Sequence, residues 1–160
     1  LRKMWRRLRG HDTRFGTAAV TFGDPLSLRR TGADMPVGEL SETLMERIAQ
    51  AMPVLVVPLI ARVLLRAEGP LPGEALLRQV AETLEQMPAR NRVPKPEVLP
   101  ERLARATARL QKRSVISEGD VGWQIVEGQE AVLGFYANSI AHFAPDDAAP
   151  AAEIAASAGS

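Results

Sequence analysis

Residues 54–67 read VLVVPLIARVLLRA, and this stretch decides how the chain folds. Its only charged side chains are Arg62 and Arg66, so a helix built from it is apolar nearly all round. Such a helix is buried inside a protein rather than laid on its surface. The apolar run from Met52 to Leu65 is interrupted by two prolines and Arg62, and it is shorter than the roughly 20 residues that cross a bilayer. We therefore expect a buried helix in a soluble or peripheral domain.

Three further amphipathic helices are expected on either side of this one. The first spans Gly38 to Met52, the second begins at Pro72 after the break at 68–70, and the third spans Glu101 to Arg113. A proline-rich loop from Met87 to Pro100 precedes the third helix. In each helix apolar residues recur three or four positions apart, which places them on one face. They are Leu40, Leu44, Ile48 and Met52, then Leu76, Leu77, Val80 and Leu84, then Leu103, Ala106 and Leu110.

The periodicity changes after this third helix. Two short strands, Ser114 to Ser117 and Gly122 to Val126, flank the turn residues 118–120 and predict a β-hairpin. A last helix is expected from Gln129 to Phe143, with Val132, Leu133, Tyr136, Ile140 and Phe143 facing inward. Three helices followed by a hairpin is the order of a winged helix, a fold that serves both DNA binding and protein contacts. We predict a mainly α fold with a small β component, winged-helix-like in its helical domain.

The first 36 residues follow another pattern. Leu1 to Arg9 is expected to be the end of a helix, and Phe15 to Phe22 is a compact apolar run that predicts a buried strand of a parallel sheet. The chain offers no second strand of this type, and an isolated strand is not stable alone. Because the chain begins at Leu1 rather than Met, we expect upstream residues to supply the rest of that sheet. The predicted domains are 1–36, the helical domain 37–143 and a disordered tail 144–160, which has almost no large apolar side chains.

Composition narrows the possible sites. The chain has no cysteine, which excludes disulfides and thiolate metal sites. It has only two histidines. A formal net charge of +1 gives no strong overall attraction to nucleic acid. We expect no metal and no cofactor.

Two pairs of residues could in principle form a general base. His142 and Asp147 have the spacing H-x-x-x-x-D, in which a carboxylate orients an imidazole. Asp147 lies in the expected disordered tail, however, and a mobile partner cannot hold a base in place. We therefore interpret His142 as a residue that favours a helix C-terminus through its dipole. His11 and Asp12 are interpreted as a solvated turn, and Asn138 is expected to cap or bridge backbone groups.

Basic residues cluster on two helices. The cluster on the third amphipathic helix would enter the major groove in a DNA-binding winged helix, but it also fits a solvated face opposite the apolar stripe. The N-terminal cluster could touch lipid headgroups or phosphates, or could simply be solvated. The members are Arg102, Arg105, Arg109, Lys112 and Arg113 in the first cluster, and Arg2, Lys3, Arg6, Arg7 and Arg9 in the second.

Two stretches resemble the glycerol-3-phosphate acyltransferase family, whose close relatives act on dihydroxyacetone phosphate. Residues 15–28, FGTAAVTFGDPLSL, are similar to a late strand of that family that ends in F-G-[ED]-P-[LIV]-x-L. Residues 133–143, LGFYANSIAHF, are similar to its terminal helix, which reads L-x-Y-Y-x-N-x-I-x-H. The matching residues are Phe22, Gly23, Asp24, Pro25, Leu26 and Leu28, then Leu133, Tyr136, Asn138, Ile140 and His142.

This resemblance covers about Leu1 to Phe143. It implies that residues 1–36 are the C-terminal remnant of an α/β acyltransferase domain, and that the chain is part of an enzyme of phospholipid biosynthesis. Such an enzyme moves a fatty acyl group from acyl-CoA or acyl carrier protein to the first hydroxyl of glycerol 3-phosphate. Its His–Asp box and phosphate-binding residues lie upstream of F-G-[ED]-P, so we assign no catalytic residue here and expect the fragment to be inactive. We expect the enzyme to lie peripherally on the cytoplasmic face of the bacterial inner membrane. The alternative function is that of a winged-helix module that binds nucleic acid or a protein partner.

Overall fold

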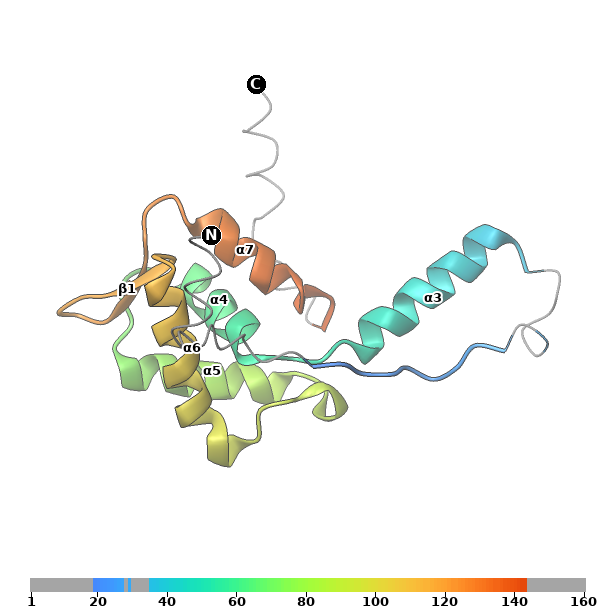
Figure 1. Cartoon of the computed structure of the whole chain (residues 1–160), viewed down its shortest axis with the longest axis horizontal. Helices are drawn as coiled ribbons and strands as arrows, with labels where there is room; N and C mark the ends of the chain where they lie inside the picture. The colour runs from blue at the N-terminus through green and yellow to red at the C-terminus, as the bar shows by residue number, and fades with distance from the viewer. Residues whose placement is uncertain (1–18, 28, 30–34, 144–160) are drawn as a thin grey trace, which may run out of the picture.

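The computed structural model describes residues 19–27, 29 and 35–143 (Figure 1). This part of the chain is mainly helical, as predicted, with five α-helices and a two-stranded antiparallel sheet. The helices are α3 (Val37–Ala51), α4 (Val56–Arg66), α5 (Gly73–Gln86), α6 (Leu99–Lys112) and α7 (Glu130–Asn138). The strands are β1 (Ile116–Glu118) and β2 (Trp123–Ile125), and the 3₁₀ turns are η1 (Ala89–Asn91), η2 (Pro96–Val98) and η3 (Ala141–Phe143).

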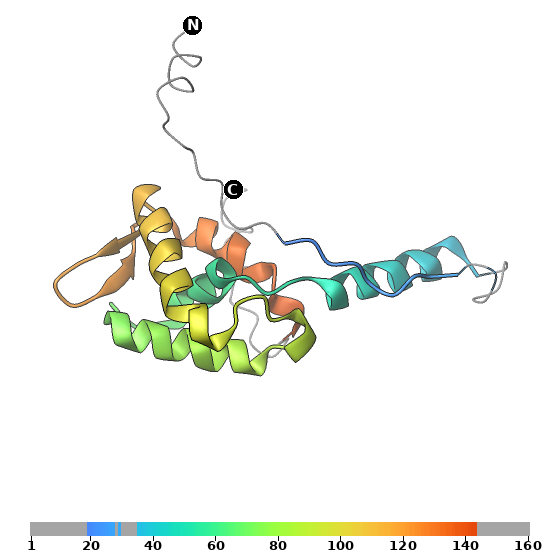
Figure 2. The same cartoon turned by 60° about the horizontal axis from the view of Figure 1, so that its bottom comes forward.

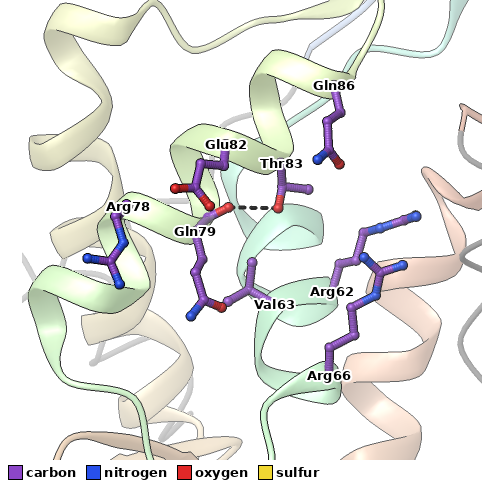
Figure 3. A pocket seen from close by; sticks show the side chains of 8 residues that line it. All are labelled: Arg62, Val63, Arg66, Arg78, Gln79, Glu82, Thr83 and Gln86. Atoms are coloured by element: carbon purple, nitrogen blue, oxygen red, sulfur yellow. Dashed lines mark hydrogen bonds between the residues drawn. The ribbon is translucent and has the colours of Figure 1, made fainter.

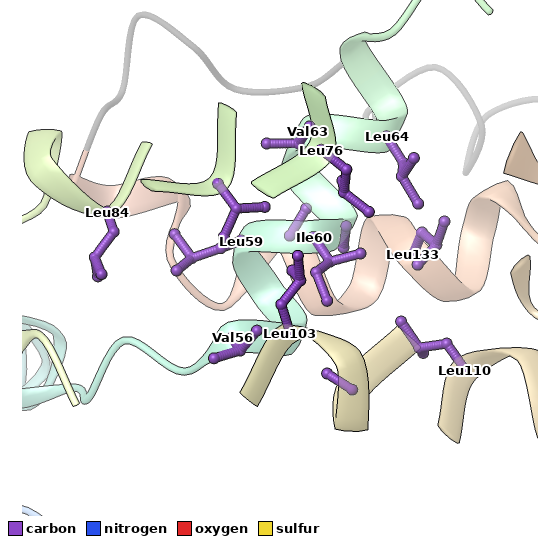
Figure 4. Close-up of a cluster of buried hydrophobic side chains, with 14 of the residues drawn as sticks. Val56, Leu59, Ile60, Val63, Leu64, Leu76, Leu84, Leu103, Leu110 and Leu133 are labelled. Atoms are coloured by element: carbon purple, nitrogen blue, oxygen red, sulfur yellow. The ribbon is translucent and has the colours of Figure 1, made fainter. Parts of the chain in front are cut away.

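Helix α4 lies at the centre of the folded body, as its composition predicts. Eight of its eleven residues are buried, and α5, α6 and α7 all pack against it (Figure 4). Each Leu or Ile side chain that is fully buried contributes roughly 1.5–3 kcal/mol, so this helix supplies a large part of the core. The side chains around it are Leu76 and Leu84 from α5, Leu103 and Leu110 from α6, and Leu133 from α7.

The hairpin is joined to the segment between α4 and α5. Leu71 and Trp123 exchange two backbone hydrogen bonds, with N···O distances of 2.8 and 2.7 Å, and so extend the sheet beyond β2. Gly122 makes this approach possible, because its φ is +144° and a Cβ there would lie 2.2 Å from the carbonyl oxygen of Leu71. No side chain fits at that position.

Helix α3 is the exception among the helices, because none of its residues is buried. Figures 1 and 2 show it projecting away from the body formed by α4 to α7. Of the predicted apolar face, Leu40 and Met52 are partly covered, whereas Leu44 and Ile48 remain exposed, as does the neighbouring Met45. Among the described residues nothing covers this exposed part of the face.

Two expectations are wrong in the described part. Residues 19–22 of the expected strand Phe15–Phe22 form no strand, and Val20 and Phe22 are 81% and 92% exposed. The reason is that no neighbouring strand lies beside them among residues 19–27 and 35–143, where the sheet pairs only the two hairpin strands with each other and Trp123 with Leu71.

The second correction concerns the last helix. It ends as an α-helix at Asn138 and continues as the turn η3. Val132 is exposed rather than inward, whereas Leu133 and Ile140 are fully buried and Tyr136 and Phe143 are half-buried. The expected helix Leu1–Arg9 and the tail 144–160 lie outside the described residues.

We expect Leu59→Ala in α4 to lower the free energy of unfolding by about 2–5 kcal/mol, because the fully buried side chain leaves a cavity. Leu44→Ala makes the same change on the exposed face of α3 and should cost less than about 1 kcal/mol. Urea denaturation followed by circular dichroism measures both values. Equal losses for the two variants would contradict the assignment of α4 as the core and α3 as uncovered.

Candidate functional site

Segments far apart in the sequence meet at the C-terminal end of α3. We call this place the α3 junction and define it by the last turns of α3 (residues 47–52), residues 23–25, Asn91 and His142. It is a candidate site because both stretches that resemble a known family, 15–28 and 133–143, have members there.

Most polar contacts of the junction are made to backbone carbonyl groups at the C-terminal end of α3. The last carbonyl groups of a helix lack partners within the helix and must be satisfied from outside. At α3 the Nε2 atom of His142 lies 2.7 Å from the carbonyl oxygen of Ala49. The Nδ2 atom of Asn91 donates to the carbonyl oxygens of Gln50 and Met52, at 2.7 and 2.9 Å. Two side chains from remote segments therefore cap one helix end.

This contact defines what His142 does in the structure. A carbonyl oxygen only accepts, so Nε2 must carry the proton in this hydrogen bond. His142 lies at a helix C-terminus, as interpreted from the sequence, but the helix is α3 rather than the helix that precedes it. Asp147, the carboxylate of the H-x-x-x-x-D spacing, lies outside the described residues.

Asn91 holds the connector between α3 and α4 through its backbone as well as its side chain. Its carbonyl oxygen accepts from the N–H of Val54 at 2.7 Å, and the N–H of Val93 donates to Val54 at 3.2 Å. Asn91 itself is buried. Asn91 lies in the expected proline-rich loop 87–100, for which the sequence indicated no functional role. Its hydrogen-bond partners lie about forty positions away, so no periodic pattern along the chain marks it.

Residues 23–25 run along α3 in the opposite direction to the helix. Arg47 donates through Nη1 to the carbonyl oxygens of Asp24 and Pro25, at 3.4 and 3.3 Å. A Cβ built on Gly23 would lie 3.4 Å from the Cβ of Ala51, so the backbone passes close to the helix there. The F-G-D-P-L stretch is thereby held against α3.

The remaining residues of the terminal motif have separate surroundings. Ile140 is fully buried in the core, and the hydroxyl of Tyr136 lies 3.5 Å from Nη1 of Arg113. Asn138 is exposed and makes no side-chain hydrogen bond to the described residues, so the bridging role expected of it is not seen there. His142 and Ile140 thus tie this motif to α3 and to the core respectively.

The basic side of α6 is a solvated face in the described structure. Arg105 pairs with Glu101 one turn earlier, and both side chains are exposed. Leu103, Ala106 and Leu110 are buried on the other side, as predicted. Exposed pairs of this kind contribute little to stability.

In the part of the chain that the structure describes, no group of three or more His, Asp or Glu residues could hold a metal ion. None of the described helices combines the length and apolar character needed to cross a bilayer. His11, Asp12 and the basic cluster from Arg2 to Arg9 lie outside the described residues. The α3 junction joins side chains of Arg47, Asn91 and His142 to backbone carbonyl groups of other segments and so holds these segments in place.

Comparison with protein families gives one match. The model of the glycerol-3-phosphate acyltransferase C-terminal region matches residues 1–158. No curated protein and no solved structure matches the chain.

We expect Asn91→Ala to lower the free energy of unfolding by about 1–3 kcal/mol, because two backbone carbonyls lose a buried donor. Amide hydrogen exchange at residues 49–54 should accelerate in the same variant, since the end of α3 is then held less firmly. The matched control is Asn138→Ala, an exposed asparagine, which should change stability by less than about 0.5 kcal/mol. If both variants unfold at the same urea concentration, Asn91 does not hold the junction.

Proposed function

The chain belongs to the family of the glycerol-3-phosphate acyltransferase C-terminal region, and on this premise we propose that it is the helical C-terminal part of an acyltransferase. The whole enzyme transfers a fatty acyl group from acyl-CoA or acyl carrier protein to the first hydroxyl of glycerol 3-phosphate. The family match over residues 1–158 carries the proposal.

The chemistry is assigned to residues outside this chain. In the reaction a His–Asp pair removes the hydroxyl proton, and the oxygen attacks the thioester carbonyl. A new C–O bond forms, the C–S bond breaks, and the thiol leaves with a proton. The described residues offer no comparable arrangement, since His142 is engaged with Ala49 through Nε2. We therefore assign no catalytic role to His142.

The chain's own task is to attach the helical body to the acyltransferase domain. Support comes from apolar side chains that remain exposed on α3 and on residues 19–22, which include Phe22, Met45 and Ile48. Exposed apolar groups gathered in one region are typical of surfaces that another domain covers. The F-G-D-P-L stretch lies against α3, so both would bind the same neighbouring domain. In this assignment residues 1–36 complete the acyltransferase domain and residues 37–143 form the helical one.

The body that α3 carries is proposed to be winged-helix-like. Its order is α4, the Leu71 bridge, α5, α6 and the hairpin β1–β2. The isolated β-bridge from Leu71, between the first two of these helices, to Trp123 of the hairpin supports this interpretation. We propose that the body binds proteins rather than nucleic acid, because the arginine face of α6 is partly neutralised by Glu101.

The enzyme would lie peripherally on the cytoplasmic face of the bacterial inner membrane.

We expect the purified 160-residue chain to show no acyl transfer from acyl-CoA or acyl carrier protein to glycerol 3-phosphate, because the base and phosphate site lie elsewhere. The enzyme that contains this chain together with its acyltransferase domain should be active in the same assay. Acylation by the chain alone would refute the proposal that the catalytic residues lie outside this chain. An inactive whole enzyme would refute the proposed reaction. Salt-dependent titration with DNA tests the alternative function, for which affinity would fall steeply with salt.

If α3 packs against the acyltransferase domain, a charge placed on its apolar face should weaken that contact. In the whole enzyme, Ile48→Asp should lower the melting temperature and the acyl-transfer rate together, because a carboxylate would be buried at the domain contact. The matched control is Val121→Asp, which places the same charge on an exposed valine of the hairpin turn and should change neither. Equal behaviour of the two variants would show that α3 does not meet the acyltransferase domain.

A further inference from the structure

A stripe of basic side chains runs along one side of α6 and ends at its C-cap residue. Its members recur at intervals of three or four positions, so they are neighbours on the helix surface. None of them is buried, because the apolar residues of α6 face the core instead. We call this set the basic stripe, and its members are Arg102, Arg105, Arg109, Lys112 and Arg113.

Most charges of the basic stripe have no counter-charge in the part of the chain that the structure describes. Arg105 pairs with Glu101. Arg102, Arg109 and Lys112 make no ion pair with any described residue. Like charges one turn apart on a helix repel each other. An anionic segment laid over the stripe would offset this repulsion.

A second group of arginines differs from the basic stripe. A polar pocket of about 470 Å³ lies between α4 and α5, and Arg62, Arg66 and Arg78 are among the residues that line it (Figure 3). Figure 3 shows Arg78 apart from the two arginines of α4. Arg62 and Arg66 are each engaged in interactions with other groups. The basic stripe is therefore the stronger candidate for an anionic partner.

The segment that follows Phe143 has the opposite charge. Residues 144–160, which we call the acidic segment, contain Asp146, Asp147 and Glu153 but no lysine or arginine. The formal charge of the whole chain is +1, so residues 1–143 carry +4 and the acidic segment carries −3. The acidic segment lies outside the described residues. Its composition makes it an anionic counterpart of the basic stripe within the same chain.

The acidic segment begins close enough to reach the basic stripe. Tyr136, whose hydroxyl lies 3.5 Å from Nη1 of Arg113, stands seven positions before Phe143. Seven helical residues span about 10 Å, and the stripe from Arg102 to Arg113 spans about 16 Å. The ten residues from Phe143 to Glu153 span about 33 Å when extended. The three carboxylates can therefore lie along the stripe without any change in the described fold.

Attachment to the same chain favours this contact over contacts with separate molecules. A tethered segment is presented to its site at an effective concentration in the millimolar range. A single exposed ion pair is weak, but three carboxylates that face one stripe act together. We propose that the acidic segment occupies the basic stripe of α6, so that any other anionic molecule must displace it. The contact needs neither acyl transfer nor the acyltransferase domain, so its test is independent of the proposed reaction.

A spin label on the acidic segment tests the contact in the full 160-residue chain. The chain has no cysteine, so Ala152→Cys gives a single labelling site beside Glu153. At low ionic strength we expect the label to broaden the amide resonances of residues 102–113 more than those of α5. The broadening should disappear in about 1 M salt, where charges are screened beyond about 3 Å. Broadening that is absent, or equal over α5 and α6, overturns the proposal.

Two triple variants of the labelled chain remove the same amount of charge from different places. The first neutralises the acidic segment, and the second neutralises exposed carboxylates of α3. They are Asp146→Asn/Asp147→Asn/Glu153→Gln and Glu39→Gln/Glu42→Gln/Glu46→Gln. The first variant should lose the broadening of residues 102–113, and the α3 variant should keep it. An equal loss in both would mean that net charge alone matters and would overturn the proposal.

Competition provides a second measurement. Fluorescently labelled polyglutamate is titrated at low ionic strength into the unlabelled wild-type chain and into both triple variants, and fluorescence anisotropy gives the affinity. The first variant should bind roughly threefold more tightly than the wild-type chain, or better, because its basic stripe is uncovered. Adding Arg102→Gln/Arg109→Gln to the first variant should remove this gain. No gain in the first variant, or an equal gain in the α3 variant, would show that the acidic segment does not cover the stripe.

Discussion

The burial of α4 on all sides is the constraint on which the rest of the structure depends. A helix that is apolar nearly all round cannot keep a face in water, so other elements must enclose it. Leu59, Ile60 and Ala61 are fully buried, and α5, α6 and α7 supply the side chains around them. The Leu71–Trp123 bridge then closes the hairpin onto the same body. The polar pocket between α4 and α5 is also a consequence of this packing, because Arg62 and Arg66 lie on the helix that the core encloses.

Helix α3 is held by a different kind of interaction. Its apolar face has no cover among the described residues, and its end is fixed by hydrogen bonds from Asn91 and His142 to its last carbonyls. Hydrogen bonds are directional, whereas apolar contacts are not. They can therefore fix where α3 leaves the body while its apolar side chains remain exposed. This arrangement is suited to a helix that carries the body towards another domain.

The two stretches that resemble the family gain a physical explanation from the junction. Asp24 and Pro25 offer backbone carbonyls to Arg47, Ile140 is packed in the core, and His142 caps α3. Each of these contacts positions backbone segments, which supports the proposal that the chain holds its helical body beside another domain.

The sequence by itself determined the helices, the hairpin and the buried centre, since these follow from periodicity and turn residues along neighbouring positions. It also indicated the family, through the motifs at 22–28 and 133–142. Only the tertiary structure decided that His142 meets Ala49, that Asn91 holds the end of α3, and that Arg62, Arg66 and Arg78 share a pocket. It also showed that residues 19–22 form no strand here.

The physical reason is the same in each case: a strand needs a partner, and a cap or a pocket needs side chains from distant segments. Periodicity describes only the order of residues along one segment and does not say which other segment will lie beside it.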